Sequence, residues 1–195
     1  MIKRTAALFS FAVLTSIGSA SVAQAQVSNP IKFTVFAGAA LPTGDLKDGV
    51  NMGYNVGAAL DYRVPLSPFG FRGEGLYSSF GAKDDQGLGD VDLSDLGANA
   101  NVVFWLPNVG SPVRPYLTGG PSYSRIKFNI SDGGTDLSIT DNNWGFNVGG
   151  GLDFALGALS TRLDVRYRRI SSDDFFGSGE SGTIGYIPIT FGLTF

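Results

Sequence analysis

The sequence predicts an all-β fold, in which an eight-stranded antiparallel up-and-down transmembrane β-barrel follows a cleaved signal peptide. Three observations support this prediction. Apolar and polar residues alternate along eight segments, as they do in strands with two different faces. The connections between these segments alternate between short and long. After the N-terminal region, no stretch contains the roughly 18 consecutive apolar residues that a membrane-spanning helix requires.

The N-terminus has the three parts of a secretory signal peptide. Two positive charges precede an apolar stretch that ends near Ile17, and the small-residue motif Ala23-Gln24-Ala25 follows. The apolar stretch is shorter than the about 20 residues of a spanning helix. We therefore expect cleavage between Ala25 and Gln26, which makes residues 1–25 the signal peptide and 26–195 the barrel domain.

The composition restricts the possible chemistry. The chain has no His and no Cys, so an imidazole base, a Ser–His pair, a thiolate nucleophile and the usual zinc ligands are excluded. Without residues 1–25 the formal net charge moves from −3 to −5. An acidic chain without a basic stripe is a poor partner for nucleic acid. We expect no enzyme activity, no catalytic or metal-binding residues, no cofactor and no nucleic-acid partner.

Three segments alternate most clearly between an apolar face for lipid and a polar face for the lumen. They lie between residues 52 and 64, 95 and 106, and 146 and 154. The apolar face of the first consists of Tyr54, Val56, Ala58, Leu60 and Tyr62. The other five predicted strands are 31–41, 69–80, 114–128, 160–170 and 183–195.

Charged residues recur at polar-face positions, most densely in segment 160–170. An eight-stranded barrel is narrow enough to be filled by side chains, so these groups require partners inside it. Six basic and five acidic residues form a nearly neutral set, which predicts a plugged lumen. This predicted lumen charge network contains Lys32, Asp61, Arg63, Arg72, Glu74, Asp95, Asp153, Arg162, Asp164, Arg166 and Arg168.

The connections favour a membrane barrel over a soluble one of the lipocalin type, which also alternates. The short connections are 65–68, 107–113 and 156–159, and they contain turn-forming Pro and Gly. The long connections, which hold most of the acidic residues, are 42–51, 81–94, 129–143 and 171–182. Outer-membrane barrels place short turns in the periplasm and long loops outside the cell. We expect that orientation here, with the C-terminus in the periplasm.

The last segment alternates up to an aromatic C-terminus, with Phe191, Leu193 and Phe195 on its apolar face. This pattern resembles the assembly signal of outer-membrane barrels. The segments Ala37–Gly44, Pro115–Gly120, Trp144–Asp153 and Leu163–Tyr167 resemble the small outer-membrane β-barrel family, which includes OmpA-type barrel domains, OmpX and the opacity proteins. The resemblance implies outer-membrane lipids, lipopolysaccharide, the barrel-insertion machinery and periplasmic chaperones as partners.

The resemblance implies a Gram-negative-type outer membrane and a structural or surface-interaction role with a plugged lumen. A narrow passive pore is the main alternative. Less favoured alternatives are an adhesin that uses its loops, with Phe175-Phe176 as a surface contact, and an envelope enzyme without His. The binding of divalent cations by the acidic loops is a further alternative. The match of residues 177–182 to G-x-G-x-x-G lacks the strand–helix context of a dinucleotide site.

Overall fold

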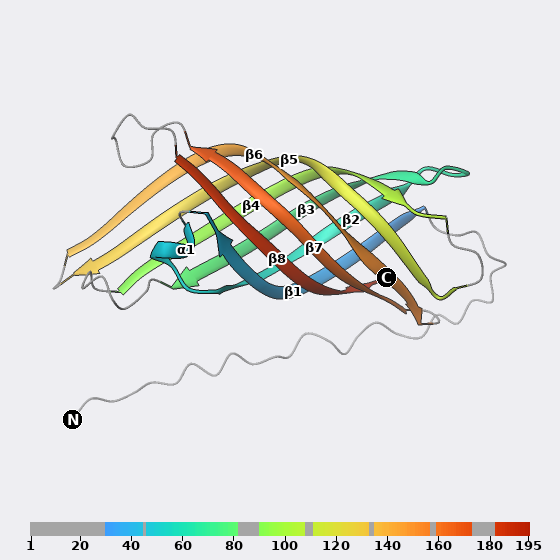
Figure 1. Cartoon of the computed structure of the whole chain (residues 1–195), viewed down its shortest axis with the longest axis horizontal. Helices are drawn as coiled ribbons and strands as arrows, with labels where there is room; N and C mark the ends of the chain where they lie inside the picture. The colour runs from blue at the N-terminus through green and yellow to red at the C-terminus, as the bar shows by residue number, and fades with distance from the viewer. Residues whose placement is uncertain are drawn as a thin grey trace, which may run out of the picture.

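The computed structural model describes residues 30–44, 46–81, 90–107, 111–132, 135–156, 159–172 and 182–195. The predicted signal peptide and its cleavage point at Ala25 and Gln26 lie outside these ranges. The described elements are β1 (Ile31–Thr43), α1 (Leu46–Gly49), β2 (Gly53–Arg63), β3 (Phe69–Gly81), β4 (Asp90–Trp105), β5 (Val113–Asp132), β6 (Thr135–Leu156), β7 (Leu159–Ser172) and β8 (Gly182–Thr194) (Figure 1). Within the described residues, no helix is long and apolar enough to cross a membrane.

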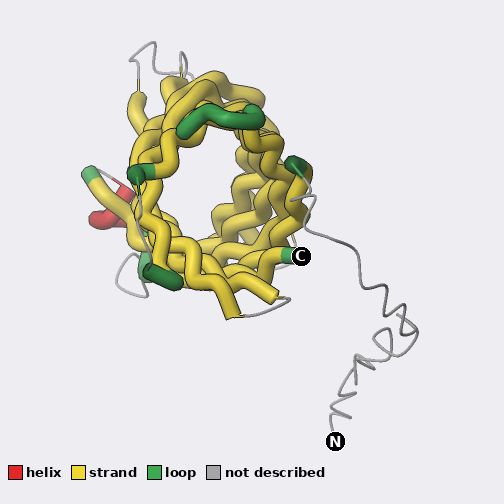
Figure 2. Tube along the Cα trace, turned by 90° about the vertical axis from the view of Figure 1, so that its right-hand side faces the viewer, coloured by secondary structure: helices red, strands yellow, loops and turns green. Residues whose placement is uncertain are grey.

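The eight strands form one closed antiparallel barrel, which confirms the predicted fold class. Each strand pairs with the next in the chain, and β8 pairs with β1 to close the ring (Figure 2). At the seam, the Phe33 and Phe195 main chains exchange two hydrogen bonds of 3.2 and 2.8 Å. Each strand thus has a partner on both sides in the wall of the barrel, where a membrane would not tolerate an open edge. Beyond the wall, residues 135–144 of β6 pair with β5 alone.

The register staggers the strands around the barrel. A path that starts at Thr34 and steps from each residue to its paired residue on the next strand reaches Ile184 on β8. Because Gly185 pairs with Thr43 of β1, Ile184 lies opposite position 44 of the chain. The stagger is thus ten residues, from 34 to 44. For eight strands this corresponds to a tilt of about 40°. We call the end with the β2–β3, β4–β5 and β6–β7 connections and the C-terminus the turn end, and the opposite end the loop end.

The outward face is apolar and carries aromatic pairs at both ends. Near the turn end, the rings of Phe69 and Phe104 are 4.9 Å apart. Toward the loop end, Tyr123 and Trp144 contact at 5.2 Å, and a second aromatic pair joins β2 to β3. Two aromatic belts around an apolar band are typical of a barrel that spans a membrane.

Two predicted loops are shorter than expected. The β5–β6 ladder continues through the Asp132–Thr135 pair, so the predicted loop 129–143 is wrong, and β4 begins at Asp90 inside the predicted loop 81–94. The reason is that the apolar residues change parity along these strands. Ile126, Phe128 and Ile130 in β5 alternate on the parity opposite to the outward-facing Tyr123, so the strand continues where its lipid-face pattern ends.

The inward face is layered, whereas the sequence predicted only that a polar face lines the lumen. Near the loop end it forms an apolar layer of Ala40, Val50, Phe80, Leu93, Ile126, Ile170, Ile184 and Tyr186. Near the turn end Val103, Trp105 and Tyr116 form a smaller cluster. The charged residues lie between these two clusters and at the turn end. Alternation separates the two faces of a strand but does not reveal this variation along the barrel axis.

A larger side chain at Gly97 would test how tightly side chains fill the lumen. A Cβ atom at this inward position would lie 2.7 Å from Nη2 of the buried Arg168, while a Cβ at the outward-facing Gly73 would meet nothing within 4 Å. We expect Gly97→Leu to lower the free energy of unfolding by about 1–3 kcal/mol through overpacking. Urea unfolding of the refolded barrel in micelles measures it, with Gly73→Leu as the matched control. Equal losses in both variants would contradict tight filling around Arg168.

Candidate functional site

All eleven charged residues of the predicted network lie on strand positions that face inward. Eight of them are buried, namely Asp61, Arg72, Glu74, Asp95, Arg162, Asp164, Arg166 and Arg168. These comprise four cations and four anions, so the buried set is neutral. The other three, Lys32, Arg63 and Asp153, are half-buried near the turn end.

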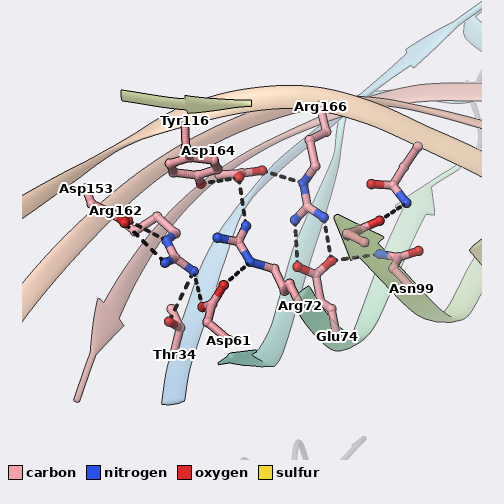
Figure 3. A network of polar contacts seen from close by, with 12 residues as sticks. Thr34, Asp61, Arg72, Glu74, Asn99, Tyr116, Asp153, Arg162, Asp164 and Arg166 are labelled. Atoms are coloured by element: carbon pink, nitrogen blue, oxygen red, sulfur yellow. Dashed lines mark hydrogen bonds and ion pairs between the residues drawn. The ribbon is translucent and has the colours of Figure 1, made fainter. Parts of the chain in front are cut away.

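A chain of ion pairs crosses the lumen between β2, β3, β6 and β7 (Figure 3). Asp61 accepts a hydrogen bond of 2.7 Å from Arg72 Nε and one of 2.8 Å from Arg162 Nη1. Arg162 also donates from Nε to Asp153 over 2.7 Å, and Arg72 Nη1 lies 3.4 Å from Asp164. Because each carboxylate is shared between two guanidinium groups, these strands are tied together across the barrel.

Arg166 and Glu74 form a bidentate pair next to this chain. The two terminal nitrogens of Arg166 donate to the two Glu74 oxygens over 2.8 and 2.9 Å. Arg166 Nε donates to Asp164, and Asn99 donates to Glu74 over 2.7 Å. The fork of an Arg matches a carboxylate in this geometry, which a Lys cannot reproduce.

Tyr116 completes the central layer from β5. Its hydroxyl donates to Asp164, and the guanidinium groups of Arg72 and Arg162 lie 4.9 and 5.4 Å from its ring centroid (Figure 3). An aromatic face attracts cations, so the ring supports two of the buried arginines. Sequence reasoning missed this residue. The polar residues Thr118, Ser122 and Ser124 share its parity along β5 and could have identified it as inward-facing.

A second polar group lies nearer the loop end. Arg168 donates to Ser124 over 2.7 Å and lies 3.6 Å from Asp95, and the Tyr186 hydroxyl donates to Asp95 over 2.7 Å. The Arg168 guanidinium carbon is 5.5 Å from the centroid of the Tyr186 ring. Tyr186 also belongs to the apolar layer, so it joins the charged part of the lumen to the apolar part.

The space left inside the barrel is small at the centre and larger at the turn end. A cavity beside Arg72, Glu74 and Arg166 has a volume of about 10 Å³. That is close to the smallest volume that holds one water molecule. At the turn end, a pocket of about 190 Å³ is lined by Lys32, Arg63 and Asp153, together with Arg114, which the sequence prediction did not include.

The predicted barrel-assembly residues lie away from the lumen. Phe191, Leu193 and Phe195 are exposed on the outward side of the β8 end, with 41 to 59% of their surface accessible. That outward position suits contact with lipid or another protein, and their role in barrel assembly stays a prediction. Phe175 and Phe176 lie outside the described residues.

The family model for the outer membrane protein beta-barrel domain matches residues 10–195. Together with the closed eight-stranded barrel, this match defines an outer-membrane barrel protein. The chain belongs to the outer membrane protein β-barrel domain family, and the resemblance inferred from the sequence is confirmed. None of the curated proteins matches the chain.

Several solved structures share the fold. Neisserial surface protein A matches with a TM-score of 0.60 and 19% identity, over 85% of this chain and 96% of that one. A major outer membrane protein from Thermus thermophilus matches with 0.56 and 16%, over 86 and 99%. The E. coli outer membrane protein W matches with 0.53 and 17%, over 87 and 99%. These similarities concern the fold, and fold alone does not decide the activity.

The central ion pairs generate a stability prediction. We expect Arg72→Met to lower the free energy of unfolding by about 3–5 kcal/mol, because it leaves Asp61 and Asp164 each with one buried cation fewer. Arg125→Met, at an exposed outward position, should change it by less than about 0.5 kcal/mol. Urea unfolding in micelles compares the two variants. A loss below about 1 kcal/mol for Arg72→Met would mean that the network contributes little to stability.

Proposed function

We propose that this protein is a non-enzymatic structural component of the outer membrane, that its lumen is closed to ions, and that it interacts through its outer surface. The observation that carries the proposal is the stacking of two different barriers inside one narrow barrel. The neutral layer of ion pairs lies beside the central cavity, and the apolar layer lies nearer the loop end. An ion would have to separate paired charges and then enter an apolar region, and both steps are costly.

The closed lumen predicts electrical silence. Refolded residues 26–195 in a planar bilayer should give no discrete conductance steps, because neither layer leaves a continuous aqueous path. Correct insertion is checked by the heat-dependent gel mobility of the folded barrel. The matched opening variant combines Glu74→Ala and Arg166→Ala with Phe80→Ala and Ile170→Ala, which thins both layers, and it should conduct.

A narrow passive pore is the second candidate, favoured by the polar pocket at the turn end, which continues the polar surface of the lumen. Reproducible steps from the unmodified barrel would support the pore and contradict the closed lumen. If Phe80→Ala/Ile170→Ala alone makes the barrel conduct, the apolar layer is the barrier to ions and the ion pairs are not.

We also propose that the loop end faces the cell exterior and contacts the phosphates of lipopolysaccharide. Arg125 and Lys127 are exposed on the outward face of β5, beyond the belt formed by Tyr123 and Trp144. Within the described ranges, neither cation takes part in an ion pair or a side-chain hydrogen bond. Cations just beyond an aromatic belt are well placed for anionic head groups.

The lipid contact is tested by thermal unfolding in micelles with and without added lipopolysaccharide. We expect the lipid to raise the Tm of the unmodified protein and to raise that of the Arg125→Gln/Lys127→Gln pair much less, because binding to the folded state stabilises it. The control is Lys32→Gln/Arg114→Gln, which removes the same charge at the turn end. If lipopolysaccharide raised the Tm of both double variants equally, the proposed contact with Arg125 and Lys127 would be contradicted.

A further inference from the structure

The turn-end pocket carries more positive charge than the rest of the lumen. Its charged lining residues are Lys32, Arg63, Arg114 and Asp153, which is three cations against one anion and a formal surplus of +2. The buried centre of the barrel, by contrast, pairs its four cations with four anions. Clustered like charges destabilise a site unless an anion neutralises them.

Most of the acceptor capacity of Asp153 is used by donors other than Lys32 and Arg114. Its Oδ1 accepts from Arg162 Nε over 2.7 Å, and its Oδ2 accepts from Arg63 Nη2 over 3.2 Å, from Trp105 Nε1 over 3.1 Å and from Arg162 Nη2 over 3.5 Å. Each carboxylate oxygen has two lone-pair positions, so the three donors around Oδ2 already exceed its capacity, and Oδ1 also holds one donor.

The strand register explains why Lys32 forms no ion pair with the described residues. Lys32 lies opposite Asp61 in the β1–β2 ladder, which would make the two a cross-strand pair. Asp61, however, accepts from Arg72 and Arg162 instead, over 2.7 and 2.8 Å. Within the described residues, Lys32 therefore has no ion-pair partner.

Arg114 is in the same position on the other side of the pocket. It lies opposite Asp153 in the β5–β6 ladder, yet the donors of Arg63, Trp105 and Arg162 take the Asp153 oxygens. No ion pair of Arg114 occurs among the residues that the structure describes. On both β1 and β5, therefore, the pocket contains a cation whose cross-strand carboxylate accepts hydrogen bonds from other residues.

We propose that this pocket binds a small oxyanion of the phosphate or carboxylate class, held between Lys32 and Arg114. The volume of about 190 Å³ accommodates such a group. Arg114 supplies a planar fork for two oxygens, and Lys32 supplies a compact charge from the facing side. The Ser160 side of the pocket offers a hydroxyl donor. Free phosphate and a carboxylate group both provide this chemistry, and in the proposed orientation the pocket opens toward the periplasm.

The test is a titration of the refolded barrel, residues 26–195, in micelles with inorganic phosphate and separately with acetate, at constant ionic strength kept with chloride. Amide resonances of Lys32, Arg114 and Ser160 report binding by nuclear magnetic resonance. We expect saturable shifts confined to the turn end. Lys32→Gln/Arg114→Gln should weaken the binding by about tenfold or more, because two charge-assisted contacts are lost.

The matched control is Lys47→Gln/Arg169→Gln, which removes the same charge from exposed positions outside the pocket and should leave the binding unchanged. Saturation by phosphate alone would assign the site to phosphate groups, and saturation by acetate as well would extend it to carboxylates. Shifts that do not saturate with either anion would overturn the proposal. So would equal weakening by the two charge-removing pairs. The Lys32 and Arg114 pair contributes to neither closed layer, so this result is independent of the conductance test.

Discussion

The barrel depends on the sharing of four buried carboxylates among four buried arginines. Strand β7 places Arg162, Asp164, Arg166 and Arg168 on one face, so closing the barrel removes all four charges from water. Such desolvation is compensated only where each charge has close, well-oriented partners. Asp61 and Glu74 on the far side of the lumen provide them, at distances of 2.8 Å to Arg162 and Arg166. Burial of charge and closure of the sheet are therefore a single event.

This coupling constrains the folding of the whole barrel. The ion-pair partners of β7 come from β2, β3, β4 and β6, so none of its pairs with β2, β3 or β4 exists before strands distant in sequence meet. The seam between β1 and β8 closes the same ring through Phe33 and Phe195. A partly closed barrel would leave the arginines facing lipid or a water-filled gap. The charged lumen thus favours the fully closed state over open alternatives.

Much of this could be predicted from the sequence, and the limits have physical causes. The period of two assigned Arg162, Arg166 and Arg168 of β7 to one face and the eleven charges to the lumen side, because strand geometry fixes parity. It did not identify Tyr116 as their partner, since an aromatic residue suits either face of a membrane strand. It also ended β5 too early. Ile126, Phe128 and Ile130 do alternate along the extended part of β5, but on the opposite parity to its lipid-facing residues, so a search for the lipid face ended the strand there.

The distribution of charge along the lumen follows from its access to water. At the centre, burial makes an unpaired charge costly, and cations and anions occur there in equal number. At the turn end, Lys32 and Arg63 are only half-buried, so solvent reduces the cost of a surplus cation. Solvent also reaches the exposed Arg114, so the fold can tolerate Lys32 and Arg114 without an ion-pair partner among the described residues. Stability neither requires nor excludes these two cations, and they are therefore available for binding. This is why the proposed anion site lies at the turn end and not at the neutral centre.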